Sequence, residues 1–163
     1  MKNILVVKAN NRPDGISTKM YEAFMEEIKN AEGYNVSTFD VFAENLTYFG
    51  QDLFNAFGKM QNGEELTAIE QASVDSMNKA RAALSPADIV VFAFPLWNQT
   101  IPAALQSFID YTYGAGYSFK YNEQGQLVSL MTDKKYIVLN ARGGYYSNPT
   151  MAPLEMAVNY INN

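Results

Sequence analysis

Three uninterrupted apolar runs of β-type residues constrain the fold of this chain more than any other feature. They are Ile4-Leu5-Val6-Val7, residues 89–94 and residues 136–139. Continuous apolar runs are typical of strands that are buried on both faces, as in a parallel sheet covered by helices. Segments with helical spacing of apolar residues separate the runs, so the order of elements is typical of a doubly wound α/β domain.

The remaining elements follow from local signals. We expect a helix with Ser17 or Thr18 as N-cap and Gly33 as its stop, an edge strand over 35–41, and an irregular or short helical segment over 42–64. We also expect helices over 66–84 and about 101–113, a hairpin-like excursion over 114–128, and a last helix from about Pro153. No repeat or linker divides the 163 residues, so a single domain over 1–163 is predicted.

Composition excludes several functions. The chain has no His and no Cys, which rules out thiolate nucleophiles, disulfides, Cys/His zinc sites and a Ser-His-Asp triad. An enzyme of this composition would therefore rely on a bound cofactor for its chemistry. The net charge of −5 argues against a nucleic-acid partner. No apolar run approaches the roughly 20 residues of a membrane span. The N-terminal apolar run is also too short for the core of a signal peptide. We therefore expect a cytoplasmic protein.

Three loops follow the buried strands: residues 9–17, 95–100 and 141–146. Doubly wound sheets bind ligands outside the carboxyl ends of their strands, so these loops are the candidate site. The first loop lacks both the Rossmann and the Walker pattern. It offers short polar residues and backbone N–H donors at a helix N-terminus, which favours phosphate. Residues 1–13 carry Lys2, Lys8 and Arg12 and no acid, so the loop tolerates an anion. The alternative is an ordinary capped βα loop.

The second and third loops suit a planar ring. Trp97, the one tryptophan, directly follows a buried strand, and Asn98 can both donate and accept hydrogen bonds. The paired glycines Gly143 and Gly144 allow a ligand to approach the backbone closely. The alternatives are that Trp97 merely covers the edge of the core, that the glycines form a tight turn, and that Arg142 is a solvated surface charge.

Three ordered motifs carry a family resemblance. Residues 95–105, Pro-Leu-Trp-Asn-Gln-Thr-Ile-Pro-Ala-Ala-Leu, match a P-[ML]-[YW]-N-x-x-[IV]-P-x-x-L pattern. Phe119-Lys120-Tyr121 matches F-[RKQ]-Y, and Arg142-Gly143-Gly144 matches R-G-G. With these motifs in register, the chain resembles the FMN-dependent NADH:azoreductases and quinone reductases of the flavodoxin-like fold, from Ile4 to about Ile161.

The resemblance implies a three-layer α/β/α fold, strand order 2-1-3-4-5, FMN as cofactor, NADH or NADPH as co-substrate, and a quinone or azo substrate. It also implies roles by position. Phosphate contacts fall to Asn10 and Ser17. The ring is cradled by Leu96, Trp97, Asn98 and Gln99, and its polar edge is capped by Ala141, Arg142, Gly143 and Gly144.

The resemblance also implies a homodimer. The helix over 101–113 adds Tyr111 and Tyr113 to its sheet-facing stripe, and Tyr117, Phe119 and Tyr121 follow it. Aromatic clusters of this kind are enriched in interfaces, so we expect this surface to contribute to the dimer. The alternative is that the rings pack on their own subunit.

The sequence departs from the family in three places. Gln99 stands where several relatives carry an apolar or aromatic residue, and Gly15-Ile16 replace part of a polar run. The family continues for about forty residues beyond Asn163 with a fifth strand, so we expect strand 135–140 to be an exposed apolar edge. Two other functions stay open: a flavodoxin-type FMN electron carrier without catalytic activity, and a binding protein without flavin.

Overall fold

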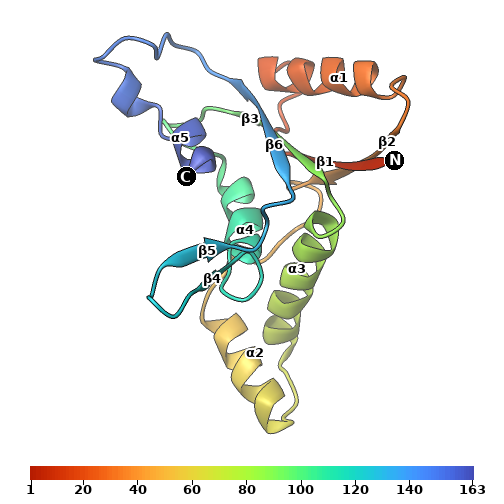
Figure 1. Cartoon of the computed structure of the whole chain (residues 1–163), viewed down its shortest axis with the longest axis vertical. Coiled ribbons are helices and arrows are strands. Elements are labelled where there is room, and N and C mark those ends of the chain that lie inside the picture. Colours follow the sequence, from red (N-terminus) through yellow and green to blue (C-terminus); the bar gives the residue numbers. More distant parts are fainter. The chain divides into compact units, whose positions relative to one another are not determined.

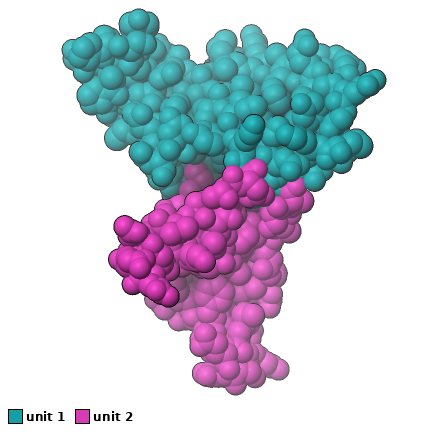
Figure 2. Space-filling view, in the orientation of Figure 1, with its two compact units in different colours: residues 1–44, 87–106, 134–163 teal, residues 45–86, 107–133 magenta.

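The computed structural model describes residues 1–163, which form two compact units (Figure 2). Unit 1 consists of residues 1–44, 87–106 and 134–163, and unit 2 consists of residues 45–86 and 107–133. Each helix is too short or too polar to traverse a lipid bilayer.

Unit 1 is built on a four-stranded parallel sheet (Figure 1). Its strands are β1 (Lys2–Lys8), β2 (Tyr34–Asp40), β3 (Ile89–Pro95) and β6 (Lys135–Ala141), in the order β2-β1-β3-β6. Ile4 lies opposite both Val36 and Ile89, which fixes the register of the three strands. The three apolar runs are therefore strands as predicted, the segment over 35–41 is an edge strand, and the order agrees with the expected 2-1-3-4.

Helix α1 (Ile16–Ile28) covers one face of this sheet. Its half-buried apolar side chains pack on a cluster of Ile4, Val6 and Val91; they are Tyr21, Phe24, Met25 and Ile28. The predicted N-cap was wrong, because the N-cap is Gly15 and the helix already includes Ser17 and Thr18. Gly33 is not the C-cap either: the helix ends at Ile28, and Gly33, with φ +87°, makes the turn into β2.

Unit 2 contains α2 (Gln51–Asn62), α3 (Ala68–Leu84) and a hairpin of β4 (Phe119–Tyr121) and β5 (Leu127–Ser129). Helix α4 (Ala103–Thr112) contributes residues to both units. The hairpin agrees with the expected excursion. Helix α3 begins two residues later than expected, because Thr67 and Glu70 form a capping box in front of it.

Helix α2 is the largest difference from the sequence-based expectation. It has 12 residues where an irregular or short helical segment was expected. Its buried side chains are only Leu53 and Ala56, and Gly58 interrupts its middle, so the apolar pattern is short and the intrinsic propensity low. Gly63 ends it in the left-handed conformation, with φ +70°.

The C-terminal segment of unit 1 is not one helix from Pro153. A 3₁₀ turn, η1 (Ala152–Leu154), precedes α5 (Ala157–Asn162), and extended backbone at Glu155 separates them. The Glu155 carboxylate accepts a hydrogen bond from the Val158 N–H group and so caps α5. Strand β6 forms the outer edge of the sheet, where Tyr136 and Ile137 are exposed as expected.

Candidate functional site

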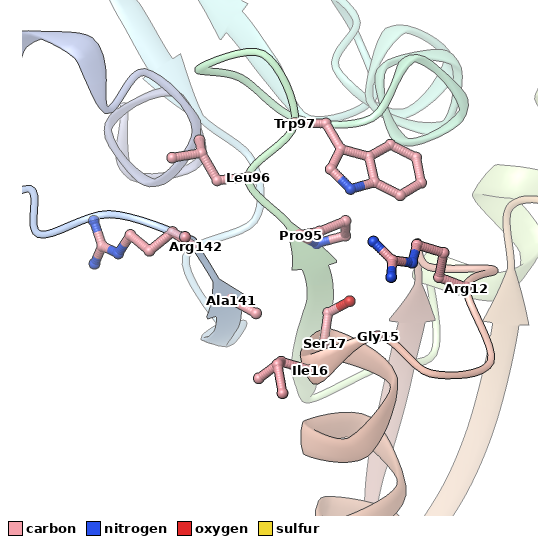
Figure 3. Close-up of a pocket in the computed structure, with 10 residues that line it drawn as sticks. Arg12, Gly15, Ile16, Ser17, Pro95, Leu96, Trp97, Ala141 and Arg142 are labelled. Atoms are coloured by element: carbon pink, nitrogen blue, oxygen red, sulfur yellow. The ribbon is translucent and has the colours of Figure 1, made fainter.

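A pocket of about 200 Å³ in unit 1 is lined by all three loops that follow buried strands (Figure 3). The lining residues are Arg12, Gly15, Ile16, Ser17, Pro95, Leu96, Trp97, Ala141, Arg142 and Gly143. The parallel sheet brings the loops together because its strands all end at the same side. The sequence predicted this convergence.

Gly15 closes a tight turn in the first loop, where a side chain would be crowded. The Gly15 N–H group donates to the Arg12 carbonyl oxygen at 3.1 Å, which closes a turn just before α1. A Cβ atom at Gly15 would lie 3.2 Å from that oxygen and 3.3 Å from the Arg12 Cβ. The Thr18 hydroxyl donates to the same oxygen at 2.6 Å. These bonds fix the start of α1 against the pocket.

Ser17 is the polar group best placed for a ligand. The residue is 4% exposed, its hydroxyl has no hydrogen-bond partner within the protein, and the hydroxyl points into the pocket (Figure 3). The N-cap Gly15 supplies no side-chain acceptor, so the first N–H groups of α1 are also left without a capping partner. No acidic residue lies in the first turn. Together these donors form a site that attracts an anion.

Asn10, the other predicted phosphate residue, has a different environment. Its side chain is fully buried and is not part of the pocket lining. The Nδ2 group donates to the Ala93 carbonyl oxygen at 3.3 Å, and Oδ1 accepts from the Thr18 hydroxyl at 3.0 Å. Asn10 therefore ties the first loop to β3 and to α1.

The second loop is a two-residue turn with left-handed backbone. Trp97 and Thr100 exchange two backbone hydrogen bonds of 3.1 Å, and between them Asn98 and Gln99 have φ values of +51° and +69°. Positive φ at both central residues defines a type I′ turn, which is costly for a residue such as glutamine. Both side chains are exposed and lie outside the pocket lining, whereas Leu96 and Trp97 line it.

Trp97 lies both at the pocket and at the edge of the core. It lines the pocket, and its ring packs against Phe42 with the centroids 6.3 Å apart. The following backbone is tied to the third loop, because the Leu96 N–H group donates to the Ala141 carbonyl oxygen at 2.7 Å. The indole therefore forms a fixed wall of the pocket and also covers the edge of the core.

The two glycines of the third loop have different surroundings. A Cβ atom at Gly143 would meet nothing within 4 Å, and Gly143 lines the pocket. A Cβ atom at Gly144 would lie 3.1 Å from the ring of Tyr146, and Gly144 is not part of the lining. The Arg142 guanidinium lies over the Tyr146 ring, 5.8 Å from its centroid. Contact with the Tyr146 ring thus explains the small residue at position 144, whereas the space beside Gly143 is open to a ligand.

Two of the cations near the first loop are already paired. Lys8 bonds Asp40 at 2.6 Å, and Arg12 bonds Asp14 at 2.9 Å. The hydrogen bonds and charge of Arg12 lower the pKa of the Asp14 carboxyl below its usual value. Sequence reasoning assigned no site role to Ile16 or Pro95. It counted Gly15 among the donors of the first loop and considered Arg12 as a cation that tolerates an anion or meets a 2′-phosphate. The adjacency of Ile16 to Ser17 and of Pro95 to Leu96 is the signal that could have found these two residues.

A second pocket, of about 540 Å³, lies in unit 2 beside α2 and α3. Its polar groups already bond one another. Lys59 pairs with the buried Glu70 at 2.8 Å, and Asn62 donates to Glu64 at 2.9 Å. The pocket of unit 1, with its unpartnered Ser17 hydroxyl, is therefore the better candidate site.

Comparisons with known proteins show the family of the chain. The chain matches the family described as "Flavodoxin-like fold" over residues 2–163. FMN-dependent NADH:quinone oxidoreductases of Brevibacillus brevis and Bacillus subtilis are 47% and 44% identical to it, over 99% of this chain and 78% of theirs.

Solved structures give the same result. An azoreductase from Bacillus anthracis superimposes with a TM-score of 0.89 at 45% identity, over 99% of this chain and 79% of the other. An FMN-dependent NADH-azoreductase from Bacillus anthracis, solved with FMN, gives a TM-score of 0.87 at 26% identity with the same coverage. The flavodoxin-like α/β fold expected from the sequence is confirmed.

Proposed function

The chain belongs to the flavodoxin-like family of FMN-dependent NADH:quinone oxidoreductases and azoreductases, and from this premise we propose that it transfers electrons from NADH through FMN to quinones or azo compounds. The support is the high identity to enzymes with that name over nearly the whole chain. The observation that carries the proposal to this chain's own residues is the Ser17 hydroxyl, which belongs to a buried residue, faces the pocket and is unpartnered at the uncapped start of α1.

The residues present fit FMN. A phosphate ester would find the Ser17 hydroxyl and the first N–H groups of α1, and an aromatic ring would find Leu96 and Trp97 beside it. The volume of about 200 Å³ is below the roughly 300–1,000 Å³ of sites that enclose a whole ligand. A flavin nucleotide would therefore be enclosed in part and would extend over the neighbouring loops.

Each loop has a distinct task in this proposal. Ser17 binds the phosphate, while Asn10 holds the first loop in position through its bonds to β3 and α1. Leu96 and Trp97 provide an apolar wall, and the backbone of Asn98 and Gln99 shapes the turn beside it. Backbone N–H groups of residues 141–144 donate to the polar edge of the ring. When bound, FMN supplies the two-electron chemistry that no side chain of this protein can provide.

The lining contains no carboxylate and the chain has no imidazole or thiol. The pocket therefore binds, orients and excludes water, and it offers no side chain as a general acid or base. We further propose a homodimer whose partner subunit completes the substrate side, and a cytoplasmic location, which the absence of cysteine accommodates.

Steady-state oxidation of NADH by the FMN-loaded protein, followed with a soluble quinone as acceptor, tests the proposed function. We expect quinone-dependent NADH consumption that requires added FMN. A flavodoxin-type carrier would bind FMN but show negligible turnover of NADH. A binding protein without flavin would stay colourless after incubation with FMN and removal of the excess. Either result would contradict the proposal.

A further inference from the structure

We propose that Arg12 is the cation that holds the phosphate of the bound flavin nucleotide, and that Asp14 competes with this phosphate for Arg12. The ion pair would then set how strongly the protein prefers a phosphorylated flavin over an unphosphorylated one. The inference rests on the proposed function, because it concerns the pocket that would hold FMN. It adds a residue and a competitor that neither the sequence motifs nor the names of the relatives assign.

Arg12 and Asp14 form a two-pronged pair that is easily exchanged. Arg12 Nε donates to one oxygen of Asp14 at 3.1 Å, and Nη2 donates to the other at 2.9 Å. The two side chains are 67% and 75% exposed. Pairs as exposed as this contribute little to stability, so a second anion can replace the carboxylate at small cost. Arg12 lines the pocket and Asp14 does not.

The base of the Arg12 side chain is fixed at the pocket. The Arg12 carbonyl oxygen accepts hydrogen bonds from the Gly15 N–H group and the Thr18 hydroxyl, so its backbone is anchored to the start of α1. The guanidinium extends from there towards the space into which Ser17 points (Figure 3). The Arg12 guanidinium could therefore contact an anion bound to Ser17 after leaving Asp14, while the Arg12 backbone stays in place.

Three other cations of unit 1 are less suited to this task. Lys8 is paired with Asp40 at 2.6 Å, and these side chains are only 24% and 26% exposed. Arg142 also lines the pocket, but its guanidinium lies over the ring of Tyr146 and is directed away from Ser17 (Figure 3). Lys19 is exposed on α1 and lies outside the lining. Of the two arginines that line the pocket, Arg12 is the one directed towards the Ser17 hydroxyl (Figure 3).

A phosphate monoester has the advantage in this competition. It carries a charge of about −1.5 to −2 at pH 7, against −1 for the Asp14 carboxylate, and its oxygens match the fork of a guanidinium. Arg12 lowers the pKa of Asp14, so the competing carboxylate stays ionised throughout the neutral range. Mild acidification therefore does not release Arg12, and the strength of the competition is set by the residue at position 14.

The test compares the dissociation constants of FMN and riboflavin, measured by quenching of flavin fluorescence in the full-length chain. Riboflavin lacks the phosphate, so the ratio of the two constants isolates the phosphate's contribution. Arg12→Gln should weaken FMN binding about tenfold or more and leave riboflavin unchanged, and Arg12→Lys should fall between. Asp14→Asn should tighten FMN binding about two- to fivefold, the scale of an exposed ion pair. Lys19→Gln and Glu22→Gln change the same charges elsewhere on α1 and should shift the ratio less than either variant of the pair.

The outcomes separate the inference from the proposed function. If the wild-type chain binds neither flavin, the proposed function fails and the inference fails with it. If wild type prefers FMN and Arg12→Gln keeps that preference, Arg12 does not hold the phosphate, although FMN binding stands. If Arg12→Gln loses the preference and Asp14→Asn matches wild type, the competition by Asp14 is refuted. Equal shifts in the Lys19 and Glu22 controls would show a general charge effect and would overturn the inference.

Discussion

Removing the Ser17 hydroxyl should affect FMN binding without affecting the stability of the fold. The residue is buried, but its hydroxyl faces the pocket and bonds no other group of the protein, so removing the hydroxyl deletes no hydrogen bond of the fold. Ser17→Ala should therefore leave the free energy of unfolding within about 0.5 kcal/mol of wild type. It should weaken FMN binding by about 1–2 kcal/mol, the scale of a charge-assisted hydrogen bond. Chemical denaturation and an FMN titration measure the two effects. Unchanged FMN affinity would remove Ser17 from the phosphate site.

The two glycines of the third loop provide a matched pair of variants. Gly143→Ala adds a methyl group where the protein has open space, so it should not lower the free energy of unfolding, and it should weaken FMN binding if a ligand occupies that space. Gly144→Ala drives a methyl group against the Tyr146 ring and should destabilise the protein by about 1 kcal/mol. FMN affinity equal to wild type in Gly143→Ala would show that no ligand approaches this backbone.

Some residues of the candidate site could be predicted from the sequence, and others could not. The residue types at the loop ends indicated Ser17, Trp97 and Gly143, because strand ends in a parallel sheet converge. Leu96, Ala141 and Arg142, which also line the pocket, were implied only by the family resemblance. The burial of Asn10 could not be predicted, since a short amide serves equally well as a ligand group and as a loop anchor. The left-handed backbone at Gln99 was equally hidden, because glutamine does not favour that conformation.

At the scale of elements, the start of α3 combines a cap with an ion pair. The Glu70 carboxylate accepts from Lys59 at 2.8 Å and from the Thr67 N–H group at 2.7 Å. These bonds, the Lys59 bond foremost, lower the pKa of Glu70. The folded state therefore holds the charged form more strongly than the unfolded state does. Its stabilising effect is present above the unfolded pKa of about 4.3 and is lost as the pH falls through the lowered pKa of the folded state.

Glu70→Gln should accordingly destabilise the protein near pH 7, and the difference from wild type should shrink towards pH 3. Urea denaturation at several pH values between 3 and 7 measures this difference. Glu65→Gln, at an exposed neighbouring carboxylate, is the control and should give a small change at every pH. A difference for Glu70→Gln that stays constant down to pH 3 would contradict the role of its charge.

The elements also differ in how much the sequence revealed. The strands were readable because burial on both faces requires continuous apolar residues. Helix α2 was not, because it buries only Leu53 and Ala56, and its stability depends on tertiary packing rather than on local propensity. The capping box of Thr67 and Glu70 is a readable signal that would have placed the start of α3 correctly.

At the scale of the whole molecule, the aromatic side chains of unit 2 bear on assembly. Tyr111 is fully buried, with its hydroxyl 2.6 Å from that of Thr47, so the expectation that it contributes to an interface surface was wrong. Tyr113 and Tyr121 are exposed and both contact the ring of Phe119, with centroids 4.9 and 5.8 Å apart. Exposed aromatic side chains of this kind are enriched in interfaces, so this group is the candidate dimer surface.

Light scattering at micromolar concentration should therefore give the mass of a homodimer. Tyr113→Ser with Tyr121→Ser should shift the mass towards the monomer, whereas Tyr48→Ser, at another exposed tyrosine, should not. A wild-type monomer would refute the dimer. Broad species of high mass would point instead to pairing through the exposed edge at Tyr136 and Ile137.

The most direct test of FMN binding at this pocket is the fluorescence of Trp97 during a titration with FMN. Trp97 is the one tryptophan of the chain and lines the pocket, so its emission reports on this site alone. We predict that its emission falls and saturates at one FMN per chain, and that the protein stays yellow after gel filtration. Emission that is the same without and with excess FMN, from protein that elutes colourless, would contradict FMN binding at this pocket.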